Sequence, residues 1–423
     1  MTPRRPLTVR SVRHVAVAAL LLVAGAGVAL AQSLEPAWTV RFGGEGNENV
    51  FDLAAAPDGS AYLVGGAQGE LERPVEGIFD AFVHAFDVDG EARWTRQLGT
   101  PAWDLARGAA VAPNGDLVVA GYSEGDLAGP NAGGSDGWAL RLSPDGEEIW
   151  RIGLASAGDD ELEAVAVGGD GTIYLAGATT GELAEANAGG WDALLVALAP
   201  DGSERWRVQT GTAADDRAYV LAAVAGGGVN LGLHSQGDLG GTNEGGRDGL
   251  VLRYDAAGER VWQHALRSPD DVRVLGLAAG PDGGAIVAGA GPASDEDGGS
   301  VPGFVRAVDA GGNERWEAAF GPARPDMRFP VAVAGDGSVW VGATTEDELA
   351  GPQAGVADAA LLVFGPEGGE RSTLQFGSPR FDGAAALAAV DGAVLVAGTS
   401  QGPLPGAPDD AFDSDGYLMR FAL

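Results

Sequence analysis

Carboxylates recur along this chain at a fixed spacing, and they are the side chains best suited to do chemistry. They stand ten residues after the tryptophan positions of an internal repeat, or nine in the case of Asp271: Glu48, Asp104, Asp160, Asp216, Asp326, Asp382 and Asp271. If these acids converge, they could bind a cation or a cationic ligand. The alternative is structural, because a position repeated in each copy commonly accepts hydrogen bonds from the backbone of its own turn.

A second pattern, acid-Leu-x3-Asn-x4-Asp, predicts loops rich in oxygen ligands. Its three full copies are Asp126/Asn131/Asp136, Glu182/Asn187/Asp192 and Asp238/Asn243/Asp248. Ca²⁺ takes about six to eight oxygen ligands of this kind. Asparagine and aspartate beside glycine are also ordinary loop formers. Both interpretations stay open, and no cofactor other than Ca²⁺ is expected.

Residues suited to catalysis are scarce. Cysteine is absent, which excludes disulfides, thiolate metal sites and a cysteine nucleophile. His84, His234 and His264 occupy unrelated positions, so neither a histidine metal site nor a Ser-His-Asp triad is indicated. Adjacent acids such as Asp159 and Asp160 could do acid–base work, but such pairs in loops are commonly just solvated. We expect no enzymatic activity.

Tryptophan marks the repeat that must position the acids. The first five copies carry it at equal intervals, at Trp38, Trp94, Trp150, Trp206 and Trp262. The interval to Trp316 is two positions shorter, and Ser372 holds the seventh position after a further full interval. A period of roughly 56 residues, with several turn signals in each copy, is typical of a radial array of small sheets.

Each copy contains four short apolar segments, which we name A to D. In the second copy, segment A is a small-residue run over 107–112, and the turn Pro113-Asn114-Gly115 leads to a β-branched run over 117–121. Asn-Gly and Asp-Gly between apolar runs favour β-hairpins. The pattern predicts an all-β fold, a seven-bladed β-propeller with four-stranded antiparallel blades.

The two ends of the chain predict how the ring closes. The last copy stops after segment C at Leu423, while Trp38 to Phe42 forms a D segment with no copy of its own. We expect the N-terminal strand to complete the last blade, which removes two exposed sheet edges. After a signal peptide over 1–31, residues 32–423 form one domain, whose blades cover about 46–98, 102–154, 158–210, 214–266, 270–320, 324–376 and 380–423 plus 34–42.

Alternating strand directions separate two faces. The tight A–B and C–D turns share one face, and the longer D–A and B–C loops share the other, which we call the top face. The top face carries the recurring acids and the loop aromatics Trp103, Trp191 and Phe381. Binding residues commonly lie on loops of a rigid scaffold, so the top face is the candidate binding surface.

Charge and the N-terminus restrict partner and location. The formal net charge is −34, and all 26 basic residues are arginine, which argues against nucleic acid as a partner. Residues 1–31 combine four arginines, an apolar run and Ala29-Leu30-Ala31, as in a cleaved signal peptide. We expect a secreted monomer, periplasmic or extracellular, with no membrane insertion after cleavage.

The copies resemble the bacterial seven-bladed β-propeller repeat known as SBBP. The resemblance lies in stretches such as 181–195 (GELAEANAGGWDALL) and 200–206 (PDGSERW), and it covers nearly all of the chain after residue 31. It implies an exported propeller and no common activity. The fifth copy departs from the pattern at Val301-Pro302-Gly303, and the seventh at Ser372 and in the loop from Gln401 to Ser414.

The C–D segments are also similar to those of two other propeller groups. The quinone-cofactor propellers have a cofactor site whose motifs this chain lacks, and the outer-membrane assembly propeller is usually a lipoprotein, which requires a cysteine. The sequence therefore predicts an exported scaffold that binds a protein or a surface glycan through its top face. The alternatives are a glycan hydrolase or lyase that uses the recurring acids and a calcium-stabilised structural module.

Overall fold

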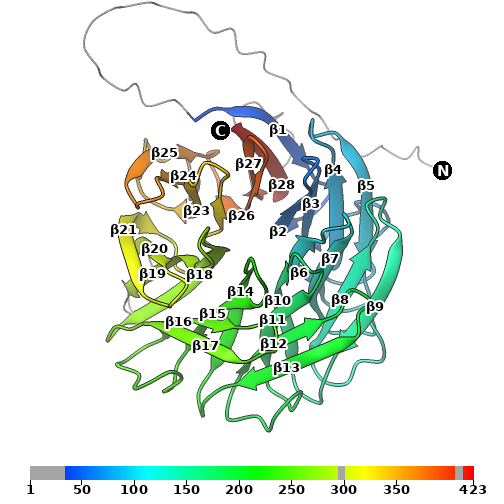
Figure 1. Ribbon diagram of the computed structural model, residues 1–423. Coiled ribbons are helices and arrows are strands. Elements are labelled where there is room, and N and C mark those ends of the chain that lie inside the picture. The colour runs from blue at the N-terminus through cyan, green and yellow to red at the C-terminus, as the bar shows by residue number, and fades with distance from the viewer. Residues whose placement is uncertain (1–33, 294–300, 405–412) are drawn as a thin grey trace, which may run out of the picture.

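Seven four-stranded antiparallel sheets form a ring in the computed structural model, which describes residues 34–293, 301–404 and 413–423 (Figure 1). This confirms the predicted seven-bladed β-propeller. The expected signal peptide and most of the loop between Gln401 and Ser414 lie outside the described residues. The described part of the chain contains no helix of the length and hydropathy that a membrane span requires.

The strands follow the order A, B, C, D outward from the axis in every blade. The innermost A strands are β2 (Glu48–Ala55), β6 (Asp104–Val111), β10 (Asp160–Val167), β14 (Asp216–Ala223), β18 (Asp271–Ala279), β22 (Val331–Val333) and β26 (Asp382–Val390). The B strands are β3 (Ala61–Ala67), β7 (Leu117–Ser123), β11 (Ile173–Thr179), β15 (Val229–Ser235), β19 (Ala285–Ala293), β23 (Val339–Thr345) and β27 (Ala393–Ser400).

The outer half of each blade is equally regular. The C strands are β4 (Asp80–Phe86), β8 (Asp136–Leu142), β12 (Asp192–Leu198), β16 (Asp248–Tyr254), β20 (Val301–Val308), β24 (Asp358–Phe364) and β28 (Asp415–Ala422). The D strands are β5 (Ala92–Leu98), β9 (Glu148–Leu154), β13 (Glu204–Thr210), β17 (Arg260–Leu266), β21 (Glu314–Ala323), β25 (Glu370–Phe376) and, from the N-terminal end, β1 (Pro36–Phe42). The blades, numbered 1 to 7, begin with β2, β6, β10, β14, β18, β22 and β26.

The repeated tryptophans fasten each blade to the next one. The indole N–H of Trp94, on strand D of blade 1, donates to the carbonyl of Pro144 in the C–D turn of blade 2 (3.0 Å). The same bond joins four further neighbouring pairs: Trp150 to Pro200, Trp206 to Ala256, Trp262 to Ala310 and Trp316 to Pro366. The turn glycine Gly146 has φ +83°, and a Cβ there would lie 2.9 Å from the Trp94 ring. Glycine therefore serves both the turn and the close approach of the indole.

Ring closure also follows the prediction and explains the missing tryptophan. Strand β1 pairs antiparallel with β28, so that Trp38 lies opposite Arg420 and Phe42 opposite Gly416. Because strands C and D of blade 7 come from opposite ends of the chain, no C–D turn joins them. A tryptophan on β25 would have no turn carbonyl in the next blade to bond, and Ser372 occupies that position.

Candidate functional site

The recurring acids begin strand A in six of the seven blades, and there their side chains are buried. The carboxylate of Asp104 accepts the backbone N–H of Thr100 (2.5 Å), and the same bond forms from Ser156 to Asp160, Thr212 to Asp216 and Ser378 to Asp382. Hydroxyl groups on strand B add a second bond, from Ser123, Thr179 and Ser400 to the acids of blades 2, 3 and 7. These carboxylates shape the D–A turns, and a ligand role for them stays a prediction.

Asp326 departs from this arrangement. It lies in a turn five residues before β22, is exposed, and pairs with Arg324 (2.7 Å) instead of capturing the backbone of a D–A turn. The sixth copy is displaced because β21 runs on to Ala323 and Pro330 has no N–H to donate, so that strand A shrinks to three residues. Asp326 thus precedes strand A of its blade but, unlike the other six acids, does not begin it.

The Asp-Asn-Asp loops fold back on themselves. In the loop of blade 2, Asp126 accepts the N–H of Asn131 (2.8 Å), the amide of Asn131 donates to the Gly134 carbonyl (2.9 Å), and Asp136 accepts the N–H of Ala132 (2.7 Å). The equivalent bonds recur at Asn187, Asp192, Asp238 and Asn243.

Two further acids of the proposed calcium set lie in the same loops without converging on a site. Asp248 is buried at the start of β16, and Glu182 is exposed. Among the described residues, no three acidic or histidine side chains are grouped so that they could hold a metal ion. Calcium binding by these loops therefore stays a prediction for titration.

The loop aromatics and the histidines contact different neighbours and do not gather at one site among the described residues. Trp103 packs against Phe79 with ring centroids 4.9 Å apart, and the guanidinium of Arg217 lies 3.9 Å from the Trp191 ring centroid. His84 is buried against Phe42, while His234 bonds the Val274 carbonyl. Phe381 lines a cavity.

One position of the repeat differs from blade to blade, and the sequence pattern did not reveal it. Strand A contains a β-bulge in blades 1 to 5 and 7, and the bypassed residues are Phe51, Arg107, Glu163, Tyr219, Leu275 and Ala385. The first five stand one full repeat apart, thirteen residues after the tryptophan register. A bulge redirects a side chain out of the regular pleat. Here it provides a set of non-repeating side chains at the centre of an otherwise repetitive ring.

Two of these side chains, Arg107 and Glu163, form a largely buried charge network with a third residue, Arg328. Glu163 of blade 3 accepts two bonds from Arg107 of blade 2 (3.0 and 2.8 Å) and one from Arg328 of blade 6 (3.2 Å), all on the oxygen Oε2. Arg328 also donates to the backbone carbonyl of Glu163 (3.2 Å). The network thus joins blades on opposite sides of the axis. The detectable signal was a pair of opposite charges, at 107 and 163, separated by one full repeat.

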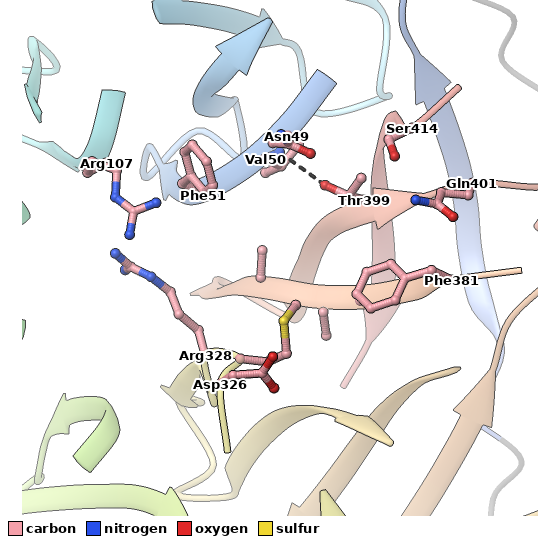
Figure 2. Close-up of a pocket in the computed structure, with 14 residues that line it drawn as sticks. Asn49, Val50, Phe51, Arg107, Asp326, Arg328, Phe381, Thr399, Gln401 and Ser414 are labelled. Atoms are coloured by element: carbon pink, nitrogen blue, oxygen red, sulfur yellow. Dashed lines mark hydrogen bonds between the residues drawn. The ribbon is translucent and has the colours of Figure 1, made fainter. Parts of the chain in front are cut away.

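A cavity of about 250 Å³ opens at the top-face end of the axis beside this network (Figure 2). Its polar or charged lining residues are Asn49, Arg107, Asp326, Arg328, Thr399, Gln401 and Ser414, and its large apolar ones are Phe51, Met327 and Phe381. Deeper along the axis, a second cavity of about 180 Å³ is lined by residues from all seven blades. Arg328 lines both and so lies between them.

Burial and charge act in opposite directions on the acids around these arginines. Burial would raise the pKa of Glu163, but the charges of Arg107 and Arg328 outweigh it and hold that pKa below its usual value. Burial also raises the pKa of Asp52, and there Arg328 and the backbone N–H groups of Ala109 and Leu53 do not compensate. Glu163 is therefore a firm anion between two cations, while Asp52 is more readily protonated.

Comparison with known proteins finds similarity over part of the chain. Residues 135–329 match the family described as outer membrane protein assembly factor BamB. A stretch of 167 residues is 29% identical to the regulatory protein FlaEY of Caulobacter vibrioides and covers 36% of this chain but 17% of that protein.

Solved structures show only weak similarity. A protein of unknown function from Dyadobacter fermentans is 11% identical, with a TM-score of 0.46 over 92% of this chain and 100% of that one. A puromycin hydrolase is 16% identical, with a TM-score of 0.49 over 83% of this chain and 50% of that one. The chain is thus a seven-bladed β-propeller whose residues 135–329 are similar to the family of the assembly factor BamB.

Proposed function

We propose that this protein is an exported, non-enzymatic propeller of the SBBP type that binds a protein or a surface glycan through its top face. It acts as a monomer and does not bind nucleic acid. The observation that carries the proposal is the break in symmetry at the top-face end of the axis, where the bulged positions of strand A differ and blades 1, 2, 6 and 7 together line a cavity. A rigid scaffold whose side chains differ from blade to blade at one end of its axis is typical of a binding surface.

Charge supports the same face. The B–C loops carry exposed acids, among them Glu124, Glu182 and Glu244 in blades 2, 3 and 4. On the opposite face, arginines of the D strands pair with turn aspartates, as Arg93 does with Asp145 and Arg315 with Asp282. The top-face acids thus favour a partner with a positively charged contact surface.

A glycan hydrolase is less well supported. Hydrolysis of this kind needs a pair of carboxyl groups, one as acid and one as base or nucleophile. Asp326 is the one carboxylate among the described residues that line the cavity, and Arg324 pairs with it. The acids that begin strand A in the other blades are buried and engaged by their own turns.

Export is supported by the N-terminal pattern of residues 1–31 and by the similarity to the family of an outer membrane assembly factor. Fractionation of cells that produce the full chain tests it. We expect a mature protein that begins at Gln32 and lies outside the cytoplasm, as measured by mass spectrometry of each fraction. Full-length protein in the cytoplasm would contradict the proposal.

Binding is tested with two matched triple variants on a glycan array and in a pulldown from the envelope fraction. The top-face variant combines Glu124→Gln, Glu182→Gln and Glu244→Gln, and the control combines the turn substitutions Asp58→Asn, Asp145→Asn and Asp201→Asn. The proposal expects a partner whose binding weakens at least about tenfold with the top-face variant and is unchanged with the control. Equal loss with both variants, or loss with the control alone, would reject the top face.

A further inference from the structure

Two arginines face one end of the top-face cavity with donors to spare. Figure 2 shows the guanidinium groups of Arg107 and Arg328 lying toward one another, while Phe381 lies on the other side of the cavity. Each guanidinium has five N–H donors. Within the described parts of the chain, Arg107 uses Nε and Nη2 on Glu163, and Arg328 uses Nη2 on the same residue. Nη1 of Arg107 and both Nε and Nη1 of Arg328 have no protein acceptor there.

The charged side chains among the described residues that line the cavity are two arginines and one aspartate. Glu163 supplies one firm negative charge for two guanidinium groups, and its side-chain bonds all use one oxygen. Two further acids lie near these guanidinium groups: Asp52, whose Oδ2 accepts the N–H of Ala109 (2.9 Å), and Glu161, which pairs with Arg217. Asp326 lies at the cavity too and pairs with Arg324 (3.0 and 2.7 Å), which also pairs with Glu346. The described lining of the cavity thus carries two positive side chains and one negative one, in a protein whose formal net charge is −34.

The rest of the lining is suited to a small apolar body. The guanidinium carbon of Arg107 lies 4.3 Å from the ring centroid of Phe51. Met327 and Phe381 add further apolar surface to the lining. Asn49, Thr399, Gln401 and Ser414 provide neutral polar groups at the wall. A volume of about 250 Å³ is at the lower limit for ligand pockets, which commonly run from about 300 to 1,000 Å³.

We propose that this cavity binds a small organic carboxylate, whose carboxylate group pairs with the free N–H groups of Arg107 and Arg328 and whose apolar body packs against Phe51, Met327 and Phe381. Planar guanidinium groups match the two oxygens of a carboxylate better than a single ammonium does. Displacing water from a cavity with apolar walls strengthens such a pair. The inference goes beyond the proposed function, because its ligand is a small molecule and its test needs no macromolecular partner.

Fluorine NMR titration with 4-fluorobenzoate tests the proposal on the intact protein, with neutral 4-fluorobenzamide as the matched ligand. We expect saturable binding of the benzoate and at least about tenfold weaker binding of the benzamide, since the amide cannot accept a charge-assisted pair from both arginines. Inorganic phosphate should compete poorly. Three outcomes would each overturn the proposal. 4-Fluorobenzamide could bind as tightly as 4-fluorobenzoate, inorganic phosphate could displace 4-fluorobenzoate at a lower concentration than unlabelled benzoate does, or the titration could show no saturation up to about 20 mM.

Variants locate the site. Arg107→Gln and Arg328→Gln should each weaken benzoate binding at least about tenfold and leave benzamide binding unchanged. The control is Arg217→Gln, since Arg217 also pairs with a glutamate of β10, Glu161, but does not line the cavity. If the glutamine variants do not fold, Arg107→Lys and Arg328→Lys decide the question, because they keep the charge but lose the planar fork. Unchanged benzoate affinity in the folded variants would overturn the assignment.

Discussion

Blades 2 to 4 keep the regular pattern of the repeat around strand A, whereas blades 6 and 1 depart from it. In the regular blades, strand A has eight residues, starts with a buried aspartate and lies beside a strand B that ends in serine or threonine. In blade 6, strand A has three residues and Asp326 is exposed, while in blade 1 the starting acid is Glu48 and its cross-strand partner is Ala67. Both altered blades line the cavity, together with blades 2 and 7. Loss of the regular pattern there makes room for side chains that serve no blade.

Glu48 tests the comparison most strongly, through pH. Burial raises its pKa to about 8, the N–H of Gly44 opposes this, and the charges of Asp415 and Asp413 add to it. Because the folded pKa lies above the ordinary value of 4.5, the contribution of Glu48 to stability is fully present below about pH 4.5 and is lost as pH rises through about 8. Glu48→Gln should therefore gain about 4 kcal/mol relative to the wild type between pH 5 and 9 by urea denaturation.

The matched control for this pH effect is Asp104→Asn. Asp104 accepts bonds from Thr100 and Ser123, so that its ionised form is better supported than that of Glu48. Its difference from the wild type should change less with pH. Parallel stability curves for Glu48→Gln and the wild type would remove the distinction between blade 1 and the regular blades.

Glu163 tests the link between the two regions. Glu163→Gln leaves Arg107 and Arg328 without their shared anion and should lower the free energy of unfolding by about 3 kcal/mol, because unpaired buried charge is costly. Glu161→Gln is the control, since Glu161 pairs with the more exposed Arg217, and about 1 kcal/mol is expected. Equal losses in the two variants, measured by urea denaturation, would show that the cross-axis network has no special weight.

The starting acids of blades 3 and 6 should respond differently to the same change. Asp160→Ala leaves the Ser156 N–H and the Thr179 hydroxyl without an acceptor, and a loss of about 2 kcal/mol is expected. Asp326→Ala removes an exposed pair with Arg324 and should cost no more than about 0.5 kcal/mol. A loss at Asp326 as large as that at Asp160, both measured by urea denaturation, would contradict the separation of the blades into regular and altered.

The tryptophan position gives the smallest expected effect on the comparison. Trp94→Phe keeps an aromatic ring but loses the indole bond to the Pro144 carbonyl, and a loss of about 1 kcal/mol is expected in thermal or urea unfolding. Ser372→Trp should not increase stability, because blade 7 offers no C–D turn to receive it. A clear gain from Ser372→Trp would mean that packing, not the indole bond, explains the tryptophan register.

The sequence predicted the fold well and the central cavity poorly, for the same physical reason. Features that recur, such as Trp94 and the turn at Gly146, identify themselves by their period. Asp326 does not occupy the place in its blade that the spacing predicts. The interval from Trp262 to Trp316 is two positions short, and Pro330 then prevents a full strand A. The network of Arg107, Glu163 and Arg328 repeats nowhere, and Arg328 falls outside the register altogether. Its partners are set by the closure of the ring, which no local pattern encodes.

The pairing of β1 with β28 has a consequence for the order in which the molecule assembles. Domains that emerge from the ribosome can begin to fold from their N-terminal part. Here β1 is near the start of the chain and its partner is near the end, so β1 must wait as an unpaired strand until synthesis of the rest is nearly complete. Until then both edges of the array are open to other chains. The pairing of β1 with β28 is therefore the last contact to form, and it is the contact that covers both open edges.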